Sequence, residues 1–113
     1  NRIYVKWFGR NSNLHRVWDS EMINSHNMSY SELALNLPNP DLLIPTEEAK
    51  DFKRSDILNW VDEIHEYTNT IYSDVSTDDK LGYEYQYKNF GTIENLLLIG
   101  GIRLAKILNY LFD

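Results

Sequence analysis

The sequence contains no cysteine and no long apolar run, and it has only five glycines and three prolines among 113 residues. Without cysteine the chain cannot form disulfides, thiolate metal sites or thiol nucleophiles, so any metal ion must bind through His, Asp, Glu or backbone groups. The longest uninterrupted apolar run, Leu96 to Ile99, is far shorter than the roughly 20 residues of a membrane-spanning helix. The sequence therefore predicts no transmembrane helix.

The composition is typical of one small domain with a modest core. Hydrophobic residues make up 42% of the chain and aromatic residues 13%, which argues against a disordered tail. The formal net charge of −6 disfavours a surface that binds nucleic acid on all sides, although local basic patches remain available. Acidic residues concentrate between Thr46 and Lys80, whereas the stretch up to Trp18 has none. The basic residues of that first stretch are Arg2, Lys6, Arg10 and Arg16.

The chain begins abruptly at Asn1, directly in strand-like sequence, with no initiator Met and no apolar leader. We therefore expect a piece of a longer protein. The alternation of Ile3, Val5 and Trp7 with polar residues predicts a short strand or hairpin arm, which the turn-forming stretch from Gly9 to Asn13 would end.

Helical spacing follows this arm. The apolar pattern from Leu14 predicts a helix to about Ser25, with Asn13 as its N-cap. Ser29 opens a capping box and a shorter helix through Leu37, which Pro38 ends. The residues from 37 to 46 hold all three prolines, so we expect an extended connection there.

Two further helices are predicted in the second half. Ser55 is placed as the N-cap of a long amphipathic helix extending beyond Ile71. Thr92 is placed as the cap of a final helix that is apolar nearly all round, which is typical of burial in a bundle. The Gly100–Gly101 pair in this helix costs about 1 kcal/mol per residue in helix propensity, which is tolerable if another helix approaches closely there, and we expect an interruption near Gly91.

His15 and Asp19 are the residues most able to carry chemistry. Their spacing of four places both side chains on one face of the predicted helix, about one turn apart. An imidazole nitrogen and a carboxylate oxygen both suit a zinc ion, although a catalytic zinc needs three protein ligands. The same spacing is also common in exposed hydrogen-bonded pairs without a metal. From the spacing alone, both interpretations stay open.

The residues around this pair resemble a known family. The segment Asn13–Asp19, which follows the strand-like segment Asn1–Gly9, is similar to the later half of the zinc-dependent single-strand-specific nucleases. These are the class I nucleases of the nuclease S-one and P-one type, which include mung bean nuclease. The segment Gly100–Asn109 resembles the closing helix of the same family. The two matches lie in the family's order and cover essentially the whole chain.

The resemblance implies a fold, a cofactor and a set of site residues. The fold is mainly helical with a short N-terminal strand arm, shared with bacterial zinc phospholipases C, and residues 1–113 are the C-terminal portion of one nuclease domain. Family members hold three zinc ions, of which one is bound by His15 and Asp19, and Asn1 contacts the nucleobase. The other zinc ligands belong to the missing N-terminal half. His26 and His65 match no ligand of the family.

The resemblance also implies the function. We expect a zinc-dependent endonuclease that cleaves single-stranded DNA and RNA to 5′-phosphorylated products and has 3′-nucleotidase activity. Secretion or periplasmic residence is implied, and the fragment alone is expected to be inactive because it supplies only two ligands. Two alternatives stay open: a zinc phospholipase C of the same fold, and a non-catalytic helical interaction domain.

Overall fold

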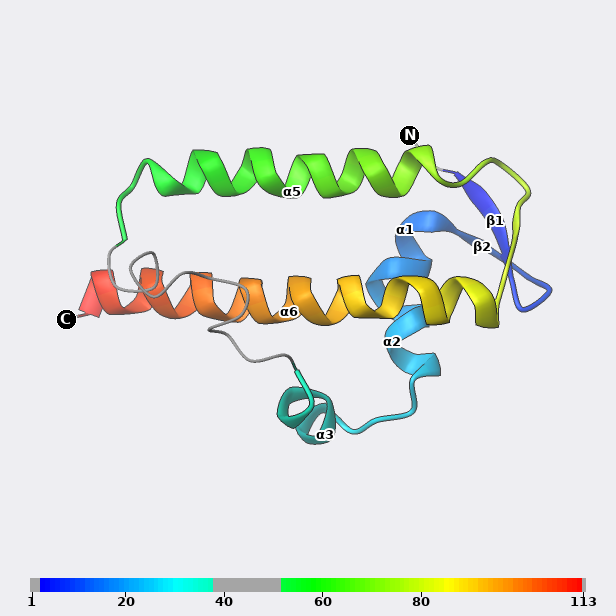
Figure 1. Ribbon diagram of the computed structural model, residues 1–113, viewed down its shortest axis with the longest axis horizontal. Helices are drawn as coiled ribbons and strands as arrows, with labels where there is room; N and C mark the ends of the chain where they lie inside the picture. The colour runs from blue at the N-terminus through cyan, green and yellow to red at the C-terminus, as the bar shows by residue number, and fades with distance from the viewer. Residues whose placement is uncertain (1–2, 38–51, 113) are drawn as a thin grey trace.

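A computed structural model describes residues 3–37 and 52–112, and helices dominate it (Figure 1). The expected mainly helical fold with a short N-terminal strand arm is therefore confirmed. The elements, in chain order, are β1 (Tyr4–Trp7), β2 (Arg10–Asn13), α1 (Leu14–Arg16), the π-helical η1 (Val17–Glu21), α2 (Met22–Ser25), α3 (Tyr30–Leu35), α5 (Asp56–Ser73), β3 (Lys80–Leu81) and α6 (Tyr83–Phe112).

The N-terminal arm is a β-hairpin that a third strand extends. The strand order is β2-β1-β3, with β2 antiparallel and β3 parallel to β1. Phe8 (φ +48°) and Gly9 (φ +80°) form the turn between β1 and β2, because a two-residue hairpin turn favours positive φ at both central positions. The prediction that Gly9 to Asn13 forms a turn is therefore wrong for Arg10 to Asn13, which form a strand.

One continuous helical segment, made of α1, η1 and α2, follows the hairpin directly. The Asn13 side chain accepts a hydrogen bond from the Arg16 backbone N–H at 2.8 Å, which confirms the predicted N-cap. The middle of the segment is a π-helical turn, closed by a bond from the Met22 N–H to the Val17 carbonyl. The sequence pattern predicted a regular helix and did not indicate this wider turn.

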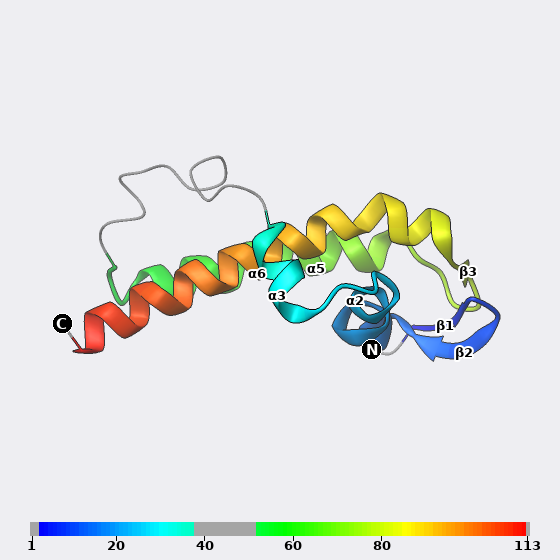
Figure 2. The same cartoon turned by 90° about the horizontal axis from the view of Figure 1, so that it is seen from below.

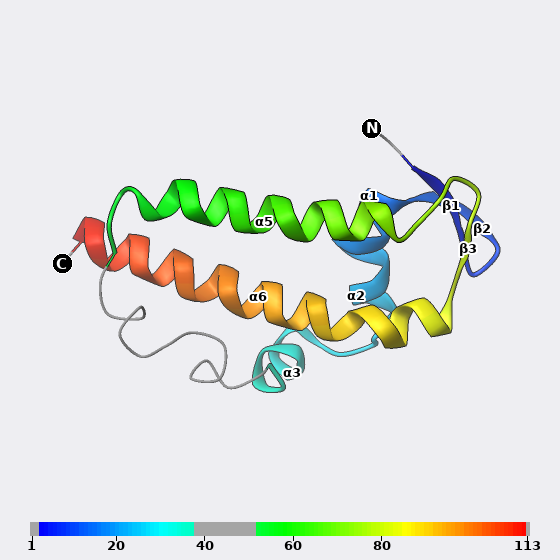
Figure 3. The same cartoon turned by 45° about the horizontal axis from the view of Figure 1, so that its top comes forward.

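The hydrophobic core lies at one end of the molecule, where the hairpin, this helical segment and the start of α6 meet (Figure 3). Trp7 of β1 is buried there, and Leu14, Val17 and Met22 are fully buried side chains. Residues far along the chain complete the core, including Phe90 and Ile93 of α6 and Val75 after α5. The core therefore fixes the helical segment against α6.

The long helices α5 and α6 run antiparallel to each other and extend away from this core (Figures 1 and 2). Arg103 of α6 forms an ion pair with Glu63 of α5, and its guanidinium lies 5.1 Å from the centre of the Trp60 ring. Near the far end, Arg54 Nε donates a hydrogen bond to the Tyr110 hydroxyl at 3.2 Å. These contacts connect α6 to α5 and to the residues just before α5, beyond the core.

The predicted starts of the two long helices need correction. Ser55 occupies the N-cap position of α5 but its side chain makes no capping bond. Instead, the Asp56 carboxylate accepts a bond from the Lys53 backbone N–H at 2.8 Å. No interruption occurs near Gly91, and Thr92 lies inside α6 and does not cap it. One helical glycine costs only about 1 kcal/mol, and burial of Phe90 beside it favours continuity.

The second half of α6 is not buried as expected. Ile99 is its last buried residue, and beyond it the large apolar side chains Leu104, Leu108, Leu111 and Phe112 are exposed. A Cβ atom added at Gly100 or Gly101 would meet nothing within 4 Å. Within residues 3–37 and 52–112, no helix therefore makes the expected close approach at this glycine pair.

By length and composition alone, α6 could cross a membrane, since its most apolar window has a mean hydropathy of 1.3. A core helix of a soluble protein has the same composition, so the prediction of no transmembrane helix stays a prediction. Counting uninterrupted apolar runs missed this property because Gly100, Arg103 and Lys106 divide the helix.

The short helix α3 confirms the predicted capping residue. The Ser29 hydroxyl accepts a bond from the Glu32 N–H at 3.2 Å and donates one to the Glu32 carboxylate at 3.0 Å. The helix ends at Leu35, two residues before the predicted Leu37. Most of the predicted proline-containing connection, from residue 38 onward, lies outside the described residues.

Candidate metal centre

The structure brings together the two residues that the spacing paired. His15 belongs to α1 and Asp19 to the π-helical turn η1. Their nearest atoms, His15 Nε2 and Asp19 Oδ2, lie 4.0 Å apart. Both side chains are largely exposed, at 77% and 74%, so neither is engaged in the core. The pair is therefore available for a ligand.

The donor set and its geometry fit one zinc ion. At bond lengths of about 2.0–2.2 Å and tetrahedral angles, two ligand atoms on one zinc lie about 3.4 Å apart. The observed 4.0 Å is close to this value, and the exposed side chains are free to rotate inward. Within residues 3–37 and 52–112, no group of three or more His, Cys, Asp or Glu could hold a metal ion. A complete zinc site therefore needs donors beyond these residues.

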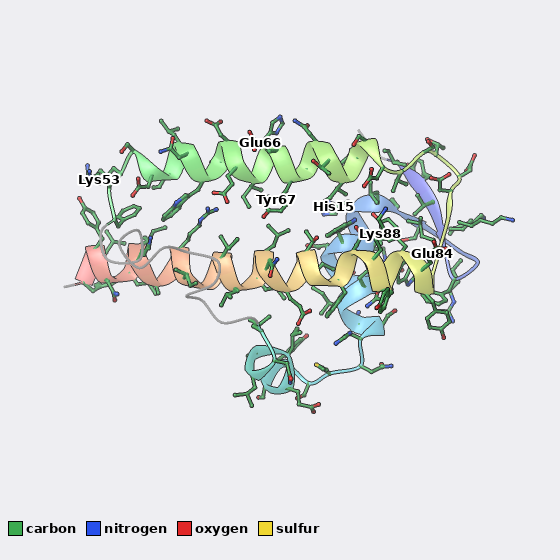
Figure 4. All side chains as sticks on the ribbon, viewed as in Figure 1. His15, Lys53, Glu66, Tyr67, Glu84 and Lys88 are labelled. Carbon is green, nitrogen blue, oxygen red and sulfur yellow. The ribbon has the colours of Figure 1, made fainter. Side chains whose placement is uncertain are left out.

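A mostly apolar cavity of about 460 Å³ lies beside the pair. His15 and Asp19 line it together with Trp18 from the same helical segment, Thr68 of α5 and Leu96 of α6. Figure 4 shows His15 on the side of α1 that faces α5. The apolar part of this lining borders the exposed His15–Asp19 pair on one side only.

Side-chain hydrogen bonds connect the π turn that carries Asp19 to α6 and to β2. The indole Nε1 of Trp18 donates a hydrogen bond to the Tyr85 hydroxyl at 2.9 Å, and the two rings pack edge to face. At the end of the turn, the Ser12 hydroxyl donates a bond to Glu21 at 2.7 Å. Arg16 also lies 3.5 Å from the Glu21 carboxylate.

Tyr85 is the functional candidate that sequence reasoning missed. Burial raises the pKa of the Tyr85 hydroxyl, the bond from Trp18 lowers it, and the Asp74 carboxylate raises it, with a net rise. The residue lies 67 positions from Trp18, so no local spacing rule could connect them. The neighbouring tyrosines of the same helix, Tyr83 and Tyr87, are exposed.

The remaining predicted residues have other positions. Asn1, the proposed nucleobase contact, lies outside the described residues. His26 stacks on the buried ring of Phe90, with ring centres 3.9 Å apart, and so belongs to the edge of the core. His65 is exposed on α5. Trp7 is buried in the core.

Comparison with known proteins identifies the class to which this helical fold and donor pair belong. A model of the family described as S1/P1 Nuclease matches residues 1–113. The chain belongs to the S1/P1 nuclease family, as the sequence resemblance predicted.

The chain is also similar to several curated plant proteins. Endonuclease 2 of Arabidopsis thaliana is 32% identical over 123 residues, which cover 99% of this chain and 42% of that protein. Endonuclease 3 of the same plant is 30% identical over 131 residues, covering 100% of this chain and 42% of that protein. The chain thus spans about two fifths of the length of the curated relatives it matches.

Proposed function

We propose that residues 1–113 are the C-terminal portion of a single zinc-dependent nuclease domain. The complete protein hydrolyses phosphodiester bonds of single-stranded DNA and RNA to 5′-phosphorylated products and acts as a 3′-nucleotidase. The observation that carries this proposal is the pair His15 and Asp19, 4.0 Å apart and exposed, in a chain of the S1/P1 nuclease family. By the same resemblance, the protein is secreted or periplasmic.

Zinc supplies the chemistry, and this chain supplies two of its ligands. Zinc lowers the pKa of bound water towards about 7 and stabilises developing charge on a phosphate. In this proposal the family's three-ion cluster is shared, and His15 and Asp19 bind one of the ions. The neutral His15 ring provides a nitrogen lone pair and the Asp19 carboxylate provides negative charge. Protonation of His15 removes that lone pair, so acid releases the metal ion.

Two features support single strands as substrates. The cavity of about 460 Å³ beside the pair is lined mostly by apolar and aromatic side chains, a surface on which an unstacked base packs. Arg10 is exposed on the N-terminal hairpin and can attract phosphate. Asn1 is proposed as a base contact through the family resemblance. Bases stacked in a duplex cannot enter such a cavity.

The missing N-terminal half is the proposed partner of the exposed side of α6. Apolar side chains on this half of the helix, including Leu104 and Leu108, are only about half covered by the described residues, and contiguous exposed apolar surface usually marks an interface. The relatives are more than twice as long as this chain, so they contain the polypeptide needed to cover it. The same half supplies the remaining zinc ligands, and residues 1–113 alone are therefore inactive.

The experiment compares the complete protein with residues 1–113 on single-stranded DNA, RNA and phosphatidylcholine, with zinc content measured in parallel. We expect nucleic acid cleavage by the complete protein only. His15→Ala should lower the zinc content and abolish cleavage, whereas His65→Ala, which removes another exposed histidine, should change neither.

Several outcomes contradict the proposal. Strong cleavage by residues 1–113 alone would show that no upstream half is needed. Turnover of phosphatidylcholine but not DNA would favour a phospholipase C. Unchanged zinc content and turnover in His15→Ala would favour a non-catalytic helical domain.

A further inference from the structure

The π-helical turn η1 begins between the two proposed zinc ligands and contains the second of them. His15 stands two residues before its first residue, Val17, and Asp19 lies within it. A π turn closes i→i+5 hydrogen bonds and is much rarer than a regular helical turn, so something must stabilise it. The relative direction of the two ligand side chains therefore depends on how this turn is held.

Trp18, between the two ligands in sequence, connects the turn to α6 by a polar contact. Its indole N–H donates to the Tyr85 hydroxyl of α6 at 2.9 Å, with ring centres 6.3 Å apart and the ring planes at 90°. One cavity, about 460 Å³, is lined by Trp18, His15 and Asp19. A second cavity, about 470 Å³, is lined by Trp18 and Tyr85 without the ligands. Trp18 therefore separates the proposed metal site from Tyr85.

Core packing and the bond from Ser12 to Glu21 hold the turn on the sides away from Trp18. Val17 anchors one side of the turn in the core, where it is fully buried. Trp18 is only partly buried, and its polar N–H needs a partner to be stable there. Without the Tyr85 hydroxyl, the indole would turn towards water and the π turn would lose a constraint on the side that carries the ligands.

The geometry points to Tyr85 as a positioning residue for the zinc site, acting through Trp18. The Tyr85 hydroxyl holds the indole, the indole helps to hold the π turn, and the turn sets the backbone position of Asp19 relative to His15. This inference rests on the proposed function, because it assumes that His15 and Asp19 bind zinc. Removing outer partners of metal ligands typically weakens metal affinity 10- to 100-fold. Since Tyr85 acts through an intermediate residue, we expect about a tenfold effect, at the lower end of this range.

The test measures the metal directly in the complete protein. Tyr85→Phe removes only the hydroxyl, and zinc affinity is measured by competition with a chromophoric chelator. Cobalt substitution then gives an absorption spectrum that reports the ligand geometry. We expect about tenfold weaker zinc binding and a changed cobalt spectrum for Tyr85→Phe. Tyr67→Phe is the matched control, since Tyr67 lines the cavity of about 470 Å³ that Tyr85 also lines (Figure 4). This control should change neither the zinc affinity nor the cobalt spectrum.

A double-mutant cycle separates positioning from general destabilisation. Trp18→Phe removes the donor, so the double variant Trp18→Phe with Tyr85→Phe should bind zinc no more weakly than Trp18→Phe alone. Wild-type zinc affinity and cobalt spectrum in Tyr85→Phe would overturn the inference, as would fully additive effects in the double variant. His15→Ala distinguishes the two failures. If it leaves zinc binding unchanged, the proposed metal site is wrong; if only Tyr85→Phe has no effect, the positioning role alone is wrong.

Discussion

Truncating the exposed leucines of α6 is expected to destabilise the complete protein. Leu104 and Leu108 lie one helical turn apart, and their exposed fractions in this chain are 57% and 44%. About half of each side chain is therefore left for burial against another surface. Since full burial of a leucine contributes about 1.5–3 kcal/mol, covering the remaining half contributes about 1 kcal/mol per residue.

The assay is urea unfolding of the complete protein carrying Leu104→Ala and Leu108→Ala together. We expect the free energy of unfolding to fall by about 2 kcal/mol, with little change in the slope against urea concentration. Leu35→Ala is the control, because Leu35 is 85% exposed on α3. A leucine that stays exposed in the complete protein should change the free energy of unfolding by less than about 0.5 kcal/mol.

Wild-type stability in the double variant would refute the reasoning, because a covered face cannot lose this much apolar contact without cost. If the complete protein bound phosphatidylcholine vesicles and the double variant did not, a membrane and not the N-terminal half would be the occupant of this face. That result would also overturn the prediction that α6 does not enter a membrane.

Three further predictions follow from individual residues. Met22→Ala should destabilise the fold by about 2–5 kcal/mol in thermal or urea unfolding, because Met22 is fully buried. Asn13→Ala should cost about 1 kcal/mol in the same assay, since Asn13 caps the ligand-bearing helical segment. The third prediction concerns alkaline pH, because the pKa of the Tyr85 hydroxyl is raised in the folded state. The neutral hydroxyl therefore contributes fully to the free energy of unfolding below a pH of about 10. This contribution is lost as the pH rises through the pKa of Tyr85 in the folded protein. Tyr85→Phe should remove this part of the alkaline decline in the melting temperature.

Features that depend on neighbours in the sequence could be predicted. The strand from Tyr4 to Trp7 follows from strict alternation, and the caps Asn13 and Ser29 follow from side chains that bond to an N–H three residues later. The proximity of His15 and Asp19 follows from their spacing of four. The family also follows from local segments, because motif residues lie close together in the sequence.

Features that depend on distant partners could not be predicted. The π turn rests on contacts such as that between Trp18 and Tyr85, and a helix-period pattern does not distinguish a π turn from an α turn. Gly91 looked like a break, but packing of Phe90 in the core outweighs its low helix propensity. The exposure of the α6 leucines was missed for another reason. An apolar pattern indicates that a face is covered, but it does not say which part of the protein covers it.

The π turn also makes this region tolerant of a change in chain length. An i→i+5 turn accommodates one residue more than an i→i+4 turn, so deleting Ser20 would let a regular α-helix form. Because the wider turn takes up the extra residue, the helical segments before and after it would keep nearly the same orientation. Leu14 and Met22, both fully buried, would then stay in the core. Related genes should therefore tolerate the loss of one codon here more readily than in a regular helix.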